Sequence, residues 1–322
     1  MAPKVLVTGS SGQIGSELVP YLRSVYGRDS VVAADIRFPE GAGNGAGPAE
    51  ILDVSDGAAL ASVVRRHGVD TIYHLAGLLS ATGENNPQQA WRVNIDGLRN
   101  VLDAARAAGV SSVFWPSSIA VFGPDTPKRD APQKTPLNPT TMYGVTKVTG
   151  ELLCNYYFLK YGLDVRSLRY PGLVSSKALP GGGTTDYAVE IFYAALTKGS
   201  YTCFLREDTV LPMMYMPDAL RASVSIMQAD RSRVPRHMGY NLAAISFSAG
   251  EIAGEIRKHV PGFRVGYAPD RRQDIADSWP ESVSDAEARR DWGWSHEYDL
   301  ASMTSDMLKR LGARLKPSTK DV

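Results

Sequence analysis

The first half of the chain alternates short apolar runs with longer stretches in which apolar residues recur at helical spacing. The short runs are rich in β-branched residues and are bounded by glycine or polar residues, which is typical of buried strands. They predict strands at residues 4–8, 30–35, 49–54, 70–77, 111–118 and 163–171. The longer stretches, several of which end at a glycine, predict helices at residues 16–27, 57–68, 87–109 and 141–162.

This alternation predicts the α/β class, with a Rossmann-type, doubly wound parallel sheet and helices on both of its faces. After about residue 175 the alternation loosens, and only helices at 248–260 and 284–294 and a strand at 264–269 are indicated. We therefore expect residues 1–174 to form a Rossmann domain. Residues 175–322 would form mainly a smaller C-terminal substrate lobe, with some segments returning to the sheet. The glycine-rich segment 40–50 predicts a surface loop.

Composition and charge exclude several classes of protein. The chain has 322 residues, a formal net charge of +1 and an ordinary hydrophobic fraction of 43%, so nothing in its charge favours nucleic acid or a membrane surface. No apolar run is long enough to span a bilayer, and the N-terminus enters a strand without a signal peptide, so we expect a cytoplasmic protein. The two cysteines, Cys154 and Cys203, build neither a disulfide framework nor a zinc site, and we expect no metal.

A cluster of glycines lies directly between the first strand and the first helix. The sequence VTGSSGQIG places Gly9, Gly12 and Gly15 where a pyrophosphate could approach the backbone at a helix N-terminus. Asp35 follows Gly15 by 20 positions at the end of the second strand, where a carboxylate can bind ribose hydroxyls and would repel a 2′-phosphate. We therefore predict NAD as the cofactor, although Arg37 leaves NADP open.

Further cofactor contacts are expected in the glycine turn and beyond the carboxyl ends of the next strands, where ligands of open α/β sheets bind. Each of these positions could also be an ordinary residue at which a strand ends and a loop begins. The residues are Gln13, Ile14, Ile36, Asp53, Val54, Leu75, Ala76 and Gly77.

Tyr143 and Lys147 are four residues apart in a predicted helix and therefore share one of its faces. A free tyrosine has a pKa of about 10, but a neighbouring ammonium and the positive nicotinamide of NAD would stabilise its phenolate, which could then act as a base. Ser118 ends the strand before this helix and could hold a substrate oxygen. Asn94 could support a water near Lys147. Considered one by one, each of these residues could be an ordinary polar residue on a helix or on the protein surface.

Taken in order, these glycines, Asp35, Asp53, Asn94, Ser118, Tyr143 and Lys147 resemble the extended short-chain dehydrogenase/reductase superfamily. Later segments, MPDALRA at 216–222 and ARRDWGW at 288–294, are also similar to that superfamily. The segment RYPGLVSSKALPGGGTTDYAVEIFYAAL at 169–196 resembles the short-chain-type L-threonine 3-dehydrogenases in particular. That resemblance implies NAD-dependent oxidation of the L-threonine 3-hydroxyl to L-2-amino-3-oxobutyrate, a product that a 2-amino-3-oxobutyrate CoA ligase can cleave.

The resemblance also implies roles for individual residues. Tyr143 would be the general base, Lys147 would tune it and hold the nicotinamide ribose, and Ser118 would bind the substrate hydroxyl. Leu173 would pack on the nicotinamide. Trp279 would close the pocket or be a buried structural tryptophan. The remaining substrate contacts that the resemblance implies are Ser80, Gly183, Thr184, Thr185 and Asp186, of which the last four belong to a loop that could open and close.

Two other functions remain open from the sequence, and the resemblance implies one further property. A UDP-sugar 4-epimerase or dehydratase would share the same cofactor and base, and a non-catalytic NAD-sensing protein would share the fold. The intact Tyr143–Lys147 pair disfavours the sensor, which has no need of a base. The superfamily also implies a homodimer that pairs the helices beginning near Trp91 and Tyr143 with their copies.

Overall fold

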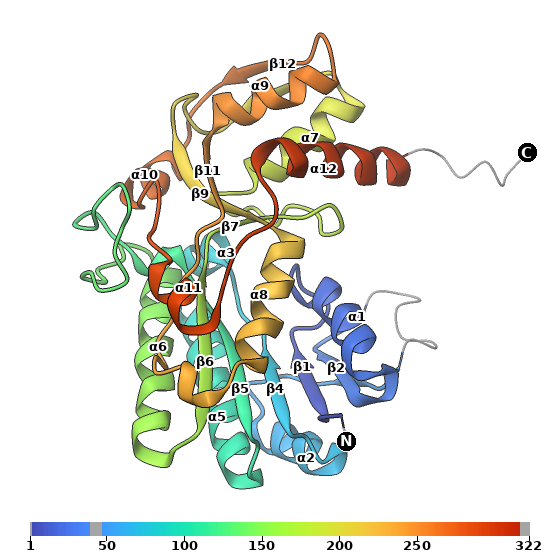
Figure 1. Ribbon diagram of the computed structural model, residues 1–322, viewed down its shortest axis with the longest axis vertical. Helices are drawn as coiled ribbons and strands as arrows, with labels where there is room; N and C mark the ends of the chain where they lie inside the picture. Colours follow the sequence, from blue (N-terminus) through green and yellow to red (C-terminus); the bar gives the residue numbers. More distant parts are fainter. Residues whose placement is uncertain (1, 39–46, 316–322) are drawn as a thin grey trace, which may run out of the picture.

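The computed structural model describes residues 2–38 and 47–315 and shows a large sheet layered between helices, with a smaller part beyond one end of the sheet (Figure 1). The predicted loop at 40–50 lies largely outside the described residues, and of its last positions residues 49 and 50 belong to a strand. The strands are β1 (Val5–Thr8), β2 (Val31–Asp35), β3 (Ala49–Ile51), β4 (Thr71–His74), β5 (Ser112–Ser118), β6 (Asp164–Tyr170), β7 (Gly172–Val174), β8 (Ser200–Cys203), β9 (Val210–Tyr215), β10 (Tyr240–Asn241), β11 (Ile245–Ser248) and β12 (Arg264–Tyr267).

The helices alternate with the strands in the first half of the chain, as the sequence predicts. They are α1 (Gly15–Tyr26), α2 (Gly57–His67), α3 (Ser80–Asn85), α4 (Pro87–Trp91), α5 (Gly97–Ala108), α6 (Met142–Tyr161), α7 (Tyr187–Thr197), α8 (Met216–Gln228), α9 (Ala249–His259), α10 (Arg272–Ser278), α11 (Ala286–Trp292) and α12 (Leu300–Leu315). A π-helical segment, Arg92–Asp96, joins α4 to α5. Short 3-10 turns lie at Arg28–Ser30, Ile119–Val121 and Arg231–Arg233.

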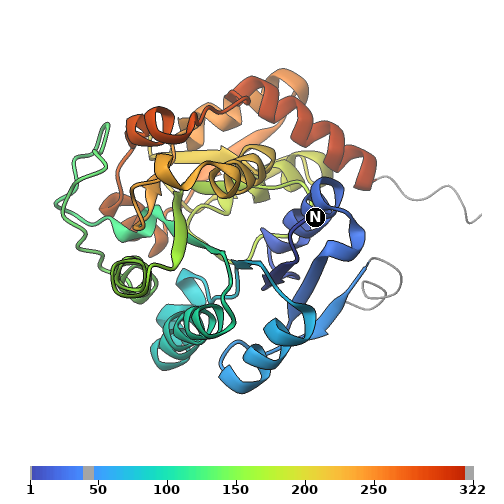
Figure 2. The same cartoon turned by 60° about the horizontal axis from the view of Figure 1, so that its bottom comes forward.

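The large sheet has the strand order β10-β6-β5-β4-β1-β2-β3, and every neighbouring pair in it is parallel. Helices α2, α5 and α6 cover one face, whereas α1 and α8 cover the other (Figure 2). Because both faces are covered, the central strands are almost completely buried, whereas the edge strand β3 is partly exposed. The predicted Rossmann-type, doubly wound sheet is therefore confirmed.

The second half of the chain forms a smaller part with its own apolar core. A three-stranded sheet of order β11-β9-β7 and a parallel pair, β12 and β8, pack with α7, α9 and α12 (Figure 1). Two elements of this half join the other part instead: β10 is an edge strand of the large sheet, and α8 packs on its face. The boundary at residue 174 stays a prediction.

Local sequence explains where the helix that follows β5 begins and ends. The Thr141 side chain accepts a hydrogen bond from the Gly144 amide at 3.1 Å and caps the first turn of α6. Gly162 ends α6 in the left-handed conformation, with φ of 70°. The helix therefore starts one residue before Tyr143, which places this side chain at the carboxyl end of the sheet.

Candidate active site

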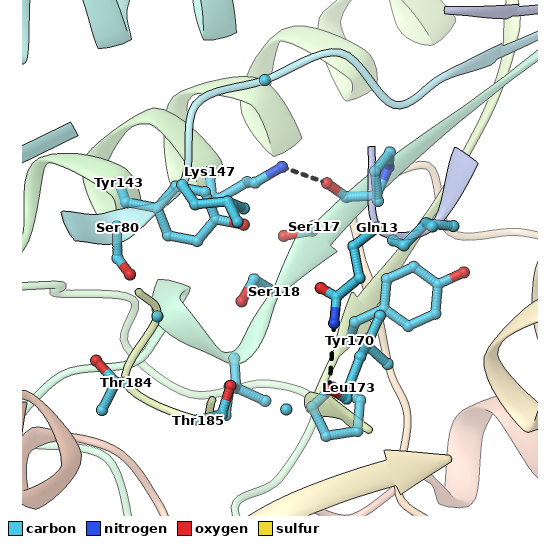
Figure 3. Close-up of a pocket in the computed structure, with 18 of the residues that line it drawn as sticks. Gln13, Ser80, Ser117, Ser118, Tyr143, Lys147, Tyr170, Leu173, Thr184 and Thr185 are labelled. Atoms are coloured by element: carbon cyan, nitrogen blue, oxygen red, sulfur yellow. Dashed lines mark hydrogen bonds between the residues drawn. The ribbon is translucent and has the colours of Figure 1, made fainter. Parts of the chain in front are cut away.

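A cavity of about 150 Å³ lies at the carboxyl ends of β5 and β6, beneath the loop that follows β7 (Figure 3). Tyr143 and Ser80 border one side, Thr184 and Thr185 border the other, and Ser118 lies between them (Figure 3). The predicted residues that line the cavity are Gln13, Ile14, Leu75, Gly77, Ser80, Ser118, Tyr143, Lys147, Leu173, Gly183, Thr184, Thr185, Asp186 and Trp279.

Lys147 is held against β5 at the floor of the cavity. Its Nζ donates a hydrogen bond to the Pro116 carbonyl at 2.6 Å. The same ammonium lies 5.3 Å from the centroid of the Tyr143 ring and 4.6 Å from that of Trp115. A side chain at Gly150 would approach within 2.3 Å of the Trp115 ring, so this glycine lets α6 lie close to the strand. The positive charge is therefore fixed beside the tyrosine.

Burial shifts the pKa values of both groups. It raises the pKa of Tyr143 to about 12, and the Ser118 hydroxyl acts in the opposite direction. Burial also lowers the pKa of Lys147 to about 8, against the opposing effects of the Cys154 side chain and then of the Glu151 carboxylate. The neighbouring lysine by itself therefore does not lower the tyrosine pKa below its ordinary value.

The glycine turn has the close backbone approach that a dinucleotide needs. Gly9 has φ of 70°, and a Cβ there would lie 2.5 Å from the Ala76 amide nitrogen. A Cβ at Gly15, the first residue of α1, would lie 2.3 Å from the Gly9 carbonyl oxygen. Asp35 accepts a hydrogen bond from the Ser11 amide at 2.9 Å, so its carboxylate lies at the turn. These residues fit a bound pyrophosphate and ribose.

The other predicted cofactor residues lie at the carboxyl edge of the sheet, outside the cavity lining. Ile36 and Arg37 are exposed directly after β2. Asp53 is exposed and accepts a hydrogen bond from the Ser55 amide, whereas Val54 is buried and faces Gly97. Gly12 lies in the turn, and Ala76 packs under Gly9. Their contacts with the cofactor stay predictions.

Asn94 is buried and does not line the cavity. Its side-chain oxygen accepts a hydrogen bond from the Leu78 amide at 2.7 Å, and its nitrogen donates to the Leu78 carbonyl and to the Thr146 hydroxyl, both at 3.1 Å. Asn94 therefore connects the loop after β4 to the turn of α6 that carries Lys147. This geometry indicates a positioning residue, and the predicted water near Lys147 stays untested.

Asp186 has a structural task in the loop that faces the cavity. Its Oδ2 accepts hydrogen bonds from the amides of Gly181 at 2.7 Å and Gly183 at 2.8 Å. This oxygen closes the turn that presents Thr184 and Thr185, so only the remaining carboxylate oxygen is free of those amides to meet a substrate ammonium. Trp279 is buried and lines the cavity, and its part in closing the pocket stays a prediction.

The structure adds lining residues that the sequence did not single out. They follow or end β4, β5 and β6, and the rule that ligands bind beyond carboxyl strand ends would have found most of them. These residues are Leu79, Pro116, Ser117, Ile119, Tyr170, Pro171 and Gly172.

Within residues 2–38 and 47–315, no group of three or more histidine, cysteine, aspartate or glutamate side chains could hold a metal ion. No helix in the described part of the chain is long and apolar enough to cross a bilayer.

The layered sheet, the glycine turn and the tyrosine–lysine pair together define a dinucleotide-dependent enzyme of the oxidoreductase type. Residues 5–243 match the model of the NAD dependent epimerase/dehydratase family. An uncharacterized epimerase/dehydratase of Staphylococcus haemolyticus is 50% identical over 310 residues, which cover 96% of this chain and 97% of the relative. The chain belongs to the NAD-dependent epimerase/dehydratase family, the extended short-chain dehydrogenase/reductases, and its cofactor is NAD.

Several solved structures of high similarity are described as L-threonine dehydrogenases. The holo form of the Cupriavidus necator enzyme is 52% identical with a TM-score of 0.93, and the match covers 96% of this chain and 100% of that one. The Clostridium difficile enzyme is 47% identical with a TM-score of 0.95, covering 97% and 98%. A monomeric L-threonine 3-dehydrogenase from a metagenome is 47% identical with a TM-score of 0.93, covering 96% and 99%.

Proposed function

We propose that this protein oxidises the 3-hydroxyl of L-threonine to L-2-amino-3-oxobutyrate with NAD. The observation that carries the proposal is the small cavity in which the Thr184–Thr185 loop faces Ser118 and Tyr143. Hydroxyl groups on both sides of a small space suit a compact, polar substrate. The similarity to solved L-threonine dehydrogenases at 47–52% identity supports the same substrate.

The geometry supports one assignment of roles in the proposed reaction. Ser118 would donate a hydrogen bond to the substrate 3-hydroxyl oxygen, while the Tyr143 phenolate takes the hydroxyl proton. Lys147, fixed by the Pro116 carbonyl, would stabilise that phenolate. When bound, NAD accepts the hydride that leaves carbon 3. Leu173, which lines the cavity and accepts a hydrogen bond from Gln13 at 3.5 Å, would pack against the nicotinamide.

A comparison of substrates tests the proposal. A second cavity of about 400 Å³, which shares Ser80 and Thr184 with the first, offers room for the nucleotide of a larger substrate. The assay therefore measures NADH absorbance with L-threonine and, separately, UDP-galactose 4-epimerisation. We expect NADH from L-threonine and no epimerisation of UDP-galactose. Epimerisation without threonine oxidation would show that the sugar-nucleotide alternative is right, and NAD binding with neither activity would favour the sensor.

Thr185→Ala tests the substrate loop. Thr185 lines the cavity opposite Ser118, and its methyl group lies close to Gly172. Loss of one hydroxyl contact should raise the KM for L-threonine roughly tenfold, the effect of about 1.5 kcal/mol. The Kd for NADH, measured by fluorescence titration, should stay nearly constant. An equal effect on both constants would contradict the assignment of this loop to the substrate.

The rate of threonine oxidation should rise with pH, because Tyr143 must lose its proton before it can act as the base. Burial raises its pKa, so at neutral pH most molecules carry a protonated phenol that cannot accept the substrate proton. The reactive form accumulates as the pH rises, and kcat for threonine oxidation should climb from about pH 7 to about pH 9. A kcat that declines over this interval in an enzyme that remains folded would be inconsistent with a tyrosine base.

We also propose a homodimer, formed through the exposed face of α6. Leu152, Tyr156 and Leu159 recur at helical spacing on this helix and are 55%, 50% and 72% exposed. Large apolar side chains in one stripe favour a protein partner. We expect Leu159→Arg to sediment as a monomer, whereas Ile51→Arg, the same change at an exposed position of β3, should leave the dimer intact. A wild-type monomer, as described for one relative, would refute the dimer.

The proposed product, a β-keto acid with an α-amino group, needs an enzyme that consumes it. A 2-amino-3-oxobutyrate CoA ligase would do so, and we place both reactions in the cytoplasm. This coupling rests on the proposed substrate.

A further inference from the structure

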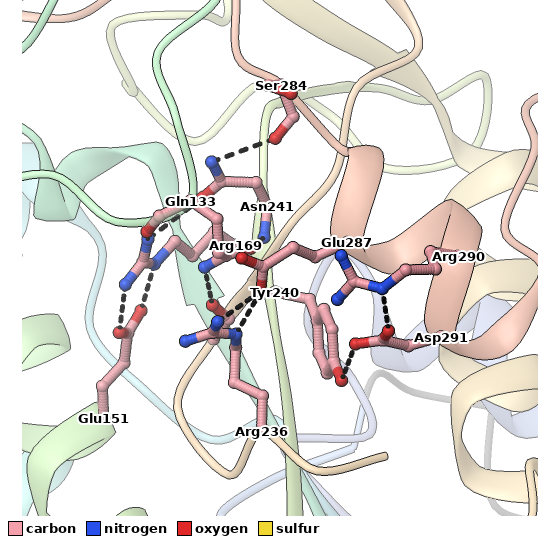
Figure 4. Close-up of polar contacts among 11 residues, drawn as sticks. Gln133, Glu151, Arg169, Arg236, Tyr240, Asn241, Ser284, Glu287, Arg290 and Asp291 are labelled. Carbon is pink, nitrogen blue, oxygen red and sulfur yellow. Dashed lines mark hydrogen bonds and ion pairs between the residues drawn. The ribbon is translucent and has the colours of Figure 1, made fainter. Parts of the chain in front are cut away.

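A buried ion pair lies directly beneath the candidate active site and is not explained by the roles above. The Glu151 side chain is 0% exposed and that of Arg169 is 3% exposed. Arg169 donates from Nε and Nη2 to the two carboxylate oxygens of Glu151 at 2.8 and 2.7 Å (Figure 4). Removing two charges from water is costly, and well-packed apolar side chains are often at least as stabilising in such places. The pair therefore calls for a reason other than stability.

The position of Glu151 on its helix supplies the first part of that reason. Tyr143, Lys147 and Glu151 are spaced by four residues, so they follow one face of α6. Each of these three side chains lies against a different residue near the end of β5. Tyr143 lies beside Ser118, Lys147 binds the Pro116 carbonyl, and Glu151 accepts a hydrogen bond from the Ser117 hydroxyl at 2.6 Å.

Arg169, the ion-pair partner of Glu151, lies in β6, the strand next to β5. Ser117 of β5 pairs in register with Arg169 of β6, and the next pair, Ser118 and Tyr170, lines the cavity. A carboxylate that holds both Ser117 and Arg169 therefore fixes the ends of two strands against the helix that carries the base.

The network also extends into the second half of the chain. Arg169 Nη1 donates to the Asn241 side-chain oxygen at 3.1 Å, and the Asn241 amide nitrogen donates to the Ser284 carbonyl at 3.2 Å (Figure 4). A Cβ at Gly239 would lie 2.5 Å from a Glu151 oxygen. The backbone of this half is thus shaped around the ion pair.

Glu151 is the carboxylate that acts on the buried Lys147. Among the described residues, no carboxylate lies within 4.0 Å of the Lys147 ammonium, whose charge burial disfavours. One helical turn away, the Glu151 carboxylate opposes this loss of charge. His74 does not add a positive charge there, because burial lowers its pKa to about 3. The titratable groups nearest the Lys147 side of the cavity include Tyr143, Glu151 and Cys154 on α6, His74 on β4, and Arg169 and Tyr170 on β6.

We propose that Glu151 is a positioning residue of this site: its contacts with Ser117 and Arg169 fix the ends of β5 and β6 against α6, and its negative charge keeps Lys147 positively charged. The structural and electrostatic parts hold for any reaction that uses this tyrosine and lysine. Only the kinetic consequence rests on the proposed function.

Titration of Lys147 by NMR tests the electrostatic part without substrate or cofactor. In protein with ¹³Cε-labelled lysine, the Lys147 signal is assigned as the one missing from Lys147→Met. Its midpoint is expected near 8 in the wild type and about one pH unit lower in Glu151→Gln, the size typical of losing a nearby opposite charge. An unchanged midpoint in folded Glu151→Gln would overturn the proposal.

Two further variants keep the test decisive if Glu151→Gln does not fold. The double variant Glu151→Gln/Arg169→Met leaves no uncompensated charge, and its Lys147 midpoint should also lie below that of the wild type. A wild-type midpoint there would overturn the electrostatic part. The matched control is Asp164→Asn, which breaks a similarly buried pair with Arg166 at the opposite end of β6 and should leave the Lys147 midpoint unchanged.

Kinetics provide the second readout. With L-threonine, the kcat of Glu151→Gln should fall roughly twofold at pH 7 and roughly tenfold at pH 9, because lowering the Lys147 midpoint from about 8 to about 7 reduces its charged fraction by these factors, while KM changes by less than about threefold. Asp164→Asn should keep the wild-type kcat. If the protein does not oxidise threonine at all, the NMR titration still decides the role of Glu151, so failure of the proposed function and failure of this inference remain distinguishable.

Discussion

Tyr143→Phe should reduce the kcat of threonine oxidation by roughly 10²–10⁴-fold, the contribution of a positioned general base. The change removes one oxygen atom and keeps the ring, which lies between Lys147 and the Thr184–Thr185 side of the cavity. No other titratable group in the cavity lining replaces this oxygen readily. Lys147 is already bonded to the Pro116 carbonyl, and one oxygen of Asp186 is held by the loop amides.

Stopped-flow measurement of NADH formation gives the rate, and fluorescence titration gives the affinity for NADH. The affinity should stay within about threefold of the wild-type value, because the glycine turn is untouched. Tyr170→Phe is the matched control, since the Tyr170 hydroxyl is bonded to Ser223 away from the cavity while its residue still lines the site. A Tyr143→Phe enzyme with wild-type turnover would exclude the tyrosine as the base.

Gly15→Ala should weaken NAD binding by roughly 5- to 100-fold. The added Cβ would lie 2.3 Å from the Gly9 carbonyl oxygen and 2.7 Å from the Ser10 Cα, so the turn before α1 must move. Overpacking of this kind costs about 1–3 kcal/mol, and the displaced amides are those expected to bind the pyrophosphate. The Kd for NADH and the thermal midpoint are the quantities to measure.

The control for this change is Gly254→Ala, another glycine within a helix. No atom lies within 4 Å of a Cβ built at Gly254 in α9, so alanine should stabilise the helix by up to about 1 kcal/mol and leave NADH affinity unchanged. If Gly15→Ala bound NADH as well as the wild type does, the turn would not be the pyrophosphate site.

The sheet was predictable because its central strands are buried on both faces, and most of them read as apolar runs separated by helical patterns. The order of the elements and the positions of Gly9, Gly15 and Tyr143 followed from this pattern. The π-helical segment that holds Asn94 was not predictable, because the apolar spacing of residues 87–109 continues through it and the sequence indicates one uninterrupted helix.

The second half was less predictable because its strands are short and pair across long separations in the chain. β9 pairs with β11 and β7, and β8 pairs with β12, and no local pattern specifies such pairing. In the site, the sequence brought forward Asp186 as a substrate contact but could not show that Gly181 and Gly183 occupy one of its oxygens. The buried partners of Glu151 were equally hidden, since Ser117 and Arg169 carry no recognisable spacing.

Transfer of deuterium from L-threonine labelled at carbon 3 tests the central claim most directly. If the protein oxidises the 3-hydroxyl, mass spectrometry should find the deuterium in the reduced cofactor, and L-threonine labelled at carbon 2 should leave the cofactor unlabelled. Reduced cofactor without deuterium, formed from L-threonine labelled at carbon 3, would contradict the proposed reaction. So would the absence of any reduced cofactor when the protein is folded and binds NAD.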